Sequence, residues 1–182
     1  MDAQTPVPLR RYLQFATIAA TACAVDLATK SLAFSRLSWG EIYWLWTGHM
    51  GFQLSLNEGA LFGLGQGKVA WFALLSVAAA IAIPVWLFVY RVAHDLWMTA
   101  ALGGVMGGIL GNLYDRLGLP GEVWPWPPQR AGEPVYAVRD WILFQYSDQW
   151  RWPNFNIADS MLVVGAALIF FRAFAAPVEA KQ

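Results

Sequence analysis

Four apolar stretches of helix length restrict the fold of this chain more than any other feature of its sequence. A helix needs about 20 mainly apolar residues to cross a bilayer, and the stretches lie at about residues 12–32, 69–90, 96–113 and 157–174. Charged residues make up only 13% of the chain, whereas an average soluble domain has about 25%. Four buried core helices would leave too little polar surface to cover them. The sequence therefore predicts an all-α membrane protein with four transmembrane helices.

The first stretch also resembles a signal peptide, because Arg10 and Arg11 precede its apolar run. The segment ATAC, Ala20–Cys23, loosely resembles a lipoprotein processing site. However, Ala20 stands where a larger aliphatic residue is usual, and three further spans follow instead of a soluble domain. We interpret the stretch as a retained helix.

Several classes of function are excluded by composition. The formal net charge is zero, so no global basic field suggests nucleic acid as a partner. The single cysteine, Cys23, excludes an intrachain disulfide and a CxxC metal site. His49 and His94 are too few and too scattered for a zinc motif. We therefore expect no metal and no cofactor.

The connections between the spans differ greatly in length. Residues 91–95 form a very short connection, while residues 33–68 and 114–156 form long ones. With four spans, both termini and the short connection lie on one side. Basic residues are not concentrated on that side, but Arg10 and Arg11 directly precede the first span, which usually dominates orientation. We expect cytoplasmic termini and two outer loops.

Each outer loop carries its own pattern. In the first, IYWLW and FQLSL are rich in aromatic and β-branched residues and flank the turn-like TGHMG, so a pair of strands is predicted. In the second, VWPWPP excludes a regular helix or a central strand. Its tryptophans suit a membrane interface.

Every span delivers polar side chains to the same outer level of the membrane. Because an ionisable group inside a membrane costs about 2.5–3.5 kcal/mol on insertion scales, several of them at one depth indicate function. The residues are Asp26 and Lys30, spaced i,i+4, Asn57 before the second span, Asn112, Asp115 and Arg116 at the end of the third, and Asn156 and Asp159 at the start of the fourth.

Some of these residues also have purely structural interpretations. Asp26 and Lys30 could be a stabilising pair, and Asn156 could cap the fourth helix. Asp115 is adjacent to the guanidinium of Arg116, which would hold its carboxylate ionised. Asp140 and Asp159 lack such a cation on their own face. Two carboxyl groups at a lipid–water boundary can act as the general acid and the general base of a hydrolysis that needs no metal.

Glycines spaced four apart run through the third span, GGVMGGILG. Gly103, Gly107 and Gly111 form one row, and Gly104 and Gly108 repeat the spacing beside it. Small residues at this spacing let helices approach closely. Close packing would bring the polar ends of several helices together.

Five motifs in order resemble the bacterial lipoprotein signal peptidases, the type II signal peptidases. They are DLATK at 26–30, NEGALFG at 57–63, GGILGNLYDR at 107–116, VRDW at 138–141 and FNIADS at 155–160. Each motif is weak alone, but the resemblance covers all four spans. It implies four transmembrane helices with a small extracytoplasmic β-domain, within one integral membrane peptidase domain over residues 1–182.

The resemblance also implies the chemistry and the site. Asp140 and Asp159 would be the catalytic pair of an aspartic endopeptidase. Its substrates would be diacylglyceryl-modified prolipoproteins, cleaved before the lipidated cysteine at the outer face of the inner membrane, and globomycin would inhibit it. The supporting and substrate-binding residues would be Asn57, Gly59, Asn112, Asp115, Arg116, Asn156, Asp26 and Lys30.

One segment departs from the family. Residues 117–139, LGLPGEVWPWPPQRAGEPVYAVR, are longer than is usual there. The segment LPGEVWPW, which contains Glu122, slightly resembles the one that normally holds the first aspartate in the family. We prefer Asp140, because the sequence that follows it continues in the register of the family to Asp159. Two rivals remain, a proton-coupled carrier using the same carboxylates and a non-enzymatic assembly subunit. The four spans show no broken helix pair or inverted repeat typical of carriers.

Overall fold

The computed structural model describes residues 5–59, 65–147 and 149–175. Four helices in this part of the chain are long and apolar enough to cross a membrane. The helical elements are α1 (Leu9–Arg36), α2 (Val69–Pro84) with its π-helical continuation η2 (Val85–Val89), the short 3-10 helix η3 (Val92–His94), α3 (Leu96–Arg116) and α4 (Ile157–Ala175). The predicted four-span membrane protein is confirmed.

The third span, expected at about residues 96–113, is present, and α3 continues three residues further through Tyr114, Asp115 and Arg116. In this added turn Asp115 pairs with Lys30 and Arg139, and Arg116 donates to the Gly59 carbonyl. The helix ends at Arg116, and Gly118 follows with a φ of 71°, which suits glycine. The Gly118 N–H donates to the Asp115 carbonyl at 2.9 Å. The long helix therefore carries its polar residues beyond the apolar stretch while holding them rigidly.

Helix α3 packs against α1, α4 and α2. A Cβ atom on Gly107 would lie 2.5 Å from the Cβ of Ala22 in α1, and one on Gly108 would lie 2.6 Å from the Ala158 carbonyl oxygen in α4. Side chains at these two positions would force the helices apart. Gly104 meets nothing within 4 Å, so its expected packing role was wrong. The glycines bring the ends of α1, α3 and α4 together.

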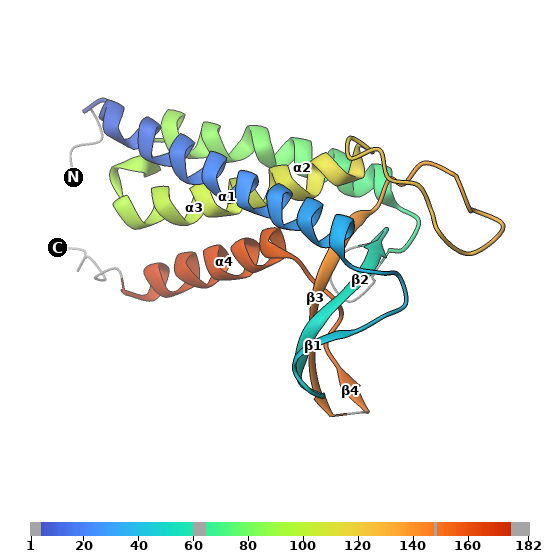
Figure 1. Cartoon of the computed structure of the whole chain (residues 1–182). Helices are drawn as coiled ribbons and strands as arrows, with labels where there is room; N and C mark the ends of the chain where they lie inside the picture. The colour runs from blue at the N-terminus through green and yellow to red at the C-terminus, as the bar shows by residue number, and fades with distance from the viewer. Residues whose placement is uncertain (1–4, 60–64, 148, 176–182) are drawn as a thin grey trace.

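The opposite end of the bundle holds the short connection. Helix α1 begins and α4 ends at this end, beside the turn from η2 to α3 (Figure 1). Asp95 caps α3 by accepting hydrogen bonds from the Trp97 and Met98 N–H groups at 2.8 and 3.2 Å. Its other oxygen lies 2.7 Å from Arg172 Nε in α4. This ion pair ties two helices together far from the polar cluster.

A small antiparallel sheet projects from the other end of the bundle (Figure 1). Its strands are β1 (Tyr43–Trp46), β2 (Met50–Asn57), β3 (Val138–Ser147) and β4 (Trp150–Arg151), in the order β1-β2-β3-β4. The predicted strands in the first outer loop are therefore confirmed. The sheet also joins that loop to the second one, because β2 pairs with β3 and places Ser55 opposite Asp140.

Residues 117–137 run from α3 to β3 without a helix or a named strand, as VWPWPP predicted. Two backbone hydrogen bonds brace the segment, from Trp124 N to the Glu133 carbonyl at 2.9 Å and from Val135 N to the Glu122 carbonyl at 3.0 Å. They surround an isolated bridge between Val123 and Pro134. The insert is thus folded back on itself beside the sheet end of the bundle (Figure 1).

Candidate active site

A buried lysine organises the polar cluster at the sheet end of the bundle. Lys30 Nζ lies 2.7 Å from Asp26 Oδ2 and 2.9 Å from Asp115 Oδ2, and it donates to Asn112 Oδ1 at 2.9 Å. The side chains of Lys30 and both aspartates are fully buried. The three ammonium protons therefore have three acceptors on α1 and α3, which joins these helices at one level.

The two carboxylates around Lys30 each have a second partner. Asp26 Oδ1 accepts from the Ala158 N–H at 2.8 Å, which fixes the first turn of α4 against α1. Asp115 Oδ1 lies 2.9 Å from Arg139 Nε, and its Oδ2 accepts from the Arg139 N–H at 3.1 Å. The two carboxylates therefore balance the charges of Lys30 and Arg139. Such pairing offsets the cost of removing the charged groups from water.

Asp115 forms its ion pairs with Lys30 and Arg139 rather than with its neighbour Arg116. Consecutive residues on a helix point in directions about 100° apart, so a cation next in sequence does not face the carboxylate directly. Arg116 donates to the Gly59 carbonyl at 3.2 Å. Its guanidinium lies 5.5 Å from the centre of the Phe72 ring, and its charge interacts with those of Asp159, Asp140 and Asp115.

Asn112 is oriented by the lysine. The ammonium group can only donate, so the atom facing Lys30 must be the amide oxygen. The Nδ2 group therefore faces Asp159 and donates to its Oδ1 at 2.9 Å. The same Asn112 oxygen also accepts from Asn156 Nδ2 at 3.2 Å. The ion cluster thereby determines which group is presented to Asp159.

Asn156 is oriented by the backbone in the same way. Its Oδ1 accepts from the Asp159 N–H at 2.8 Å, so its Nδ2 faces Asp140 and donates to Oδ1 at 2.6 Å. The Asn156 N–H donates in return to Asp159 Oδ2 at 3.3 Å. The suggested helix cap is therefore present. The same residue also holds both aspartates, because it contacts Asp140 and Asp159 at once.

Asp140 is almost completely buried, with 1% of its surface exposed. Burial, and then the negative charge of Asp159, raise the pKa of Asp140 well above the usual aspartate range. The amide group of Asn156, which donates to the carboxylate at 2.6 Å, opposes this rise. Two aspartates thus interact electrostatically in a site where both cannot ionise cheaply.

Asn57 and Gly59 line the site from the end of β2. Asn57 Oδ1 accepts from the Gly59 N–H at 3.0 Å and from Gln66 Nε2 at 3.2 Å. Asn57 and Asp140 line the same cavity. The phenylalanine of this motif, Phe62, lies outside the described residues.

Cavities open on both sides of the aspartates. One of about 470 Å³ is bounded by Asp140, and one of about 220 Å³ by Asp159 and Arg116. Both share Asn57, Pro153 and Asn154 in their walls. A third, mainly apolar cavity of about 300 Å³ lies against Asp159 and the side of α4 that carries Val163 and Val164. Each carboxyl group can therefore be reached from a space large enough for a chain segment.

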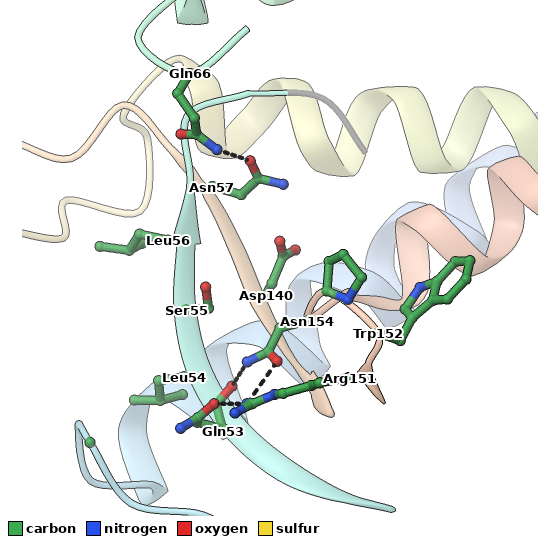
Figure 2. Close-up of a pocket in the computed structure, with 12 residues that line it drawn as sticks. Gln53, Leu54, Ser55, Leu56, Asn57, Gln66, Asp140, Arg151, Trp152 and Asn154 are labelled. Carbon is green, nitrogen blue, oxygen red and sulfur yellow. Dashed lines mark hydrogen bonds between the residues drawn. The ribbon is translucent and has the colours of Figure 1, made fainter. Parts of the chain in front are cut away.

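Sequence reasoning missed the polar residues of the larger cavity. In Figure 2, Asp140 lies between Asn57 and Asn154, with Gln53 and Arg151 below. Arg151 donates to the Gln53 side chain, and Asn154 Nδ2 donates to the Gln53 carbonyl at 2.8 Å. The alternation in QLSLN was a usable signal, because Gln53, Ser55 and Asn57 share one face of a strand.

Glu122, the alternative acid from the insert, lies elsewhere. Its Oε1 is 3.8 Å from Arg139 Nη1, on the far side of the buried cluster. It lines a separate cavity of about 240 Å³ with Ser31 and Ser35. Within the described ranges, no three His, Cys, Asp or Glu residues are grouped as metal ligands. Asp26 and Asp115 already share the ammonium of Lys30.

The fold and the site define a multi-pass membrane protein with one buried and one half-buried carboxyl group facing cavities at one end of the bundle. A family model described as signal peptidase (SPase) II matches residues 18–175. A lipoprotein signal peptidase of Rhodopirellula baltica is 46% identical over 173 residues, covering 92% of this chain and 74% of the relative. One from Chromobacterium violaceum is 33% identical over 164 residues, covering 88% and 90%.

The fold is also shared with a solved structure described as a bacterial membrane enzyme. It superposes with a TM-score of 0.72 at 24% identity and covers 100% of this chain and 99% of the other. The chain belongs to the signal peptidase II family, and it is a membrane-embedded peptidase.

Proposed function

We propose that this peptidase is an aspartic endopeptidase in which Asp140 and Asp159 carry the hydrolysis. As a signal peptidase II, it removes signal peptides from prolipoproteins. The proposal adds that the prolipoproteins are diacylglyceryl-modified and that the cut falls before the lipidated cysteine. Residues 1–182 act as one domain, and neither the carrier nor the assembly subunit is favoured beside the family match.

The observation that carries this proposal is the shared support of the two aspartates. Asn156 contacts both, while Asn112 links Asp159 to the Lys30 cluster. An acid and a base that act on one bond need fixed positions and different protonation states. The proposal places the resting proton on Asp140, because burial raises the pKa of this carboxyl group. Asp159, with a donor on each oxygen, is then the ionised base.

The mechanism follows from these states. Asp159 takes a proton from water as the water oxygen bonds to the scissile carbonyl carbon, and Asp140 gives its proton to the carbonyl oxygen. When the tetrahedral intermediate collapses, Asp159 returns its proton to the leaving nitrogen and Asp140 recovers one from a hydroxyl group. The carbon–nitrogen bond breaks, and both residues end in their starting states.

Substrate would bind along the surfaces that border the pair. An extended peptide suits the cavity along β2, where Gln53, Asn57 and Asn154 offer hydrogen-bonding groups. The diacylglyceryl group suits the apolar cavity beside Asp159, with walls of Phe155 and Val163. Globomycin-type cyclic peptides would compete for the same space. Arg116 would hold the substrate backbone near the acids.

In this proposal the site faces outward from the cytoplasmic (inner) membrane of the bacterium. Arg10 and Arg11 begin α1 at the opposite end of the bundle, beside the short connection that contains Arg91. Basic residues next to membrane spans favour the cytoplasmic side. A lipidated substrate would approach from the bilayer along α4.

We expect purified protein to cleave a prolipoprotein peptide that carries diacylglyceryl-cysteine and to leave the unlipidated peptide intact, because only the former fills the apolar cavity. A chelator should not change the rate, because the mechanism assigns each proton transfer to a carboxyl group. The measurement is the product rate in detergent, by mass spectrometry. Equal rates on both peptides would contradict the proposed substrate, and activity lost to a chelator and restored by zinc would contradict the aspartic mechanism.

A further inference from the structure

An arginine of the insert reaches the loop that borders the active site. Arg130 Nη2 lies 2.9 Å from Glu58 Oε1, a residue 72 positions away in the chain. The guanidinium stacks over Trp124, 4.0 Å from its ring centre, and Nε lies 3.5 Å from Glu133 Oε2. The side chains of Arg130 and Glu58 are 37% and 22% exposed. This contact crosses between the two outer loops at the protein surface.

The insert is built to present this arginine. The Arg130 N–H donates to the Pro127 carbonyl, and the Glu133 N–H donates to the Arg130 carbonyl, each at 2.9 Å. The Gly132 N–H donates to the Trp124 carbonyl at 3.0 Å. These bonds close a turn around residues 127–133, directly over Trp124. A planar guanidinium held by an aromatic face loses less freedom on forming its ion pair than a free one.

Glu58 is a sensitive point of attachment because of its neighbours. Asn57 on one side borders the same cavity as Asp140, and the Gly59 carbonyl on the other side accepts a hydrogen bond from Arg116. Asn57 and Gly59 are also joined by the 3.0 Å hydrogen bond that closes their turn. A displacement of Glu58 would therefore move one residue that lies beside a proposed catalytic acid and one that holds Arg116.

We propose that Arg130 is a positioning residue for catalysis, acting through Glu58 to hold the Asn57–Gly59 turn against Asp140 and Arg116. The inference rests on the proposed aspartic mechanism. It assigns the long insert a role in the chemical step, although the insert contributes no group to the reaction. The ion pair lies at the surface, so its contribution is sensitive to salt, unlike that of the buried Lys30 cluster.

The test uses full-length protein in detergent and a lipidated peptide, with Arg130→Gln and Glu58→Gln as the main variants. Misplaced supporting groups slow a reaction without removing its reactive groups, so kcat should fall about tenfold with little change in KM. Glu133→Gln is the matched control, because it removes a contact of Arg130 within the insert and leaves the ion pair with Glu58 beside the Asn57–Gly59 turn intact. It should stay within about twofold of the wild type.

Three further readouts separate positioning from general stability. The charge-reversed pair Arg130→Glu with Glu58→Arg should recover most of the rate lost by Arg130→Glu alone. Arg130→Lys should be intermediate, since it keeps the charge and loses the planar stack. Raising salt from about 0.1 M to about 1 M should slow the wild type toward Arg130→Gln and leave that variant unchanged.

The inference is overturned if folded Arg130→Gln matches the wild type in kcat, if the reversed pair recovers nothing, or if Glu133→Gln is equally slow. Circular dichroism identifies any variant that fails to fold, and the salt response of the wild-type enzyme then decides alone. Asp140→Asn is measured in the same series. Activity in that variant would contradict the aspartic mechanism itself, whereas a normal Arg130→Gln beside an inactive Asp140→Asn would contradict only the positioning role.

Discussion

Asp140→Asn and Asp159→Asn should each cleave a lipidated prolipoprotein peptide about 10²–10⁴-fold more slowly than the wild type, because each removes one positioned proton-transfer group. Neither change alters side-chain volume much, so both proteins should fold. Rates are measured on purified protein in detergent, with folding checked by circular dichroism. Glu122→Gln is the matched control. It removes the alternative acid of the insert and should leave cleavage close to the wild-type rate.

The same variants have a stability signature. The pKa of Asp140 is raised by folding, so the folded state binds its proton more tightly than the unfolded state. This stabilisation is complete below the unfolded pKa and is lost as pH rises through the folded pKa. Asp140→Asn cannot lose it. As pH rises above the ordinary aspartate range, the unfolding temperature of this variant should therefore fall less than that of the wild type. An active, folded Asp140→Asn or Asp159→Asn would remove that residue from the catalytic pair.

Lys30→Met should destabilise the protein by about 3–5 kcal/mol, as expected when one partner of a buried ion cluster is removed. The substitution keeps the volume of the aliphatic stem but leaves Asp26 and Asp115 facing each other without the ammonium group. It also removes the donor that orients Asn112 toward Asp159. Activity should therefore fall together with stability. The measurement is thermal unfolding in detergent, paired with the cleavage assay.

Lys68→Met provides the comparison for Lys30→Met, because Lys68 is an exposed lysine before α2. It should change the unfolding temperature little. If Lys30→Met unfolds at the same temperature as Lys68→Met, the buried cluster does not hold the helices together. If Lys30→Met is unstable yet fully active at low temperature, the cluster does not orient the site.

The spans and most of the polar cluster were predictable from local sequence. Hydropathy located the four helices because a bilayer imposes a length on each of them. The i,i+4 spacing of Asp26 and Lys30 placed both on one face, and the structure pairs them at 2.7 Å. Local spacing did not reveal the partners of Asp115. One of them, Lys30, lies on another helix, and the other, Arg139, is 24 residues away on β3, which pairs with β2.

Long-range contacts of the loops could not be read from the sequence. The VWPWPP segment excluded regular structure, but nothing in it indicated that Arg130 meets Glu58 across 72 residues. Arg151 and Asn154 became site residues only because β4 pairs with β3 and the chain brings both residues to Gln53 of β2. By contrast, Gln53, Ser55 and Asn57 alternate in the sequence, and this missed signal would have indicated three polar side chains on one strand face.

The pH dependence of kcat/KM for a lipidated peptide tests the catalytic pair most directly. If one aspartate accepts a proton and the other donates one, the profile is bell-shaped, and its two apparent pKa values belong to the pair. The residual activity of Asp140→Asn and of Asp159→Asn should then not show a bell-shaped pH profile of kcat/KM. A wild-type profile that is flat across the accessible range, or a bell that persists unchanged in either variant, would show that other groups perform the proton transfers.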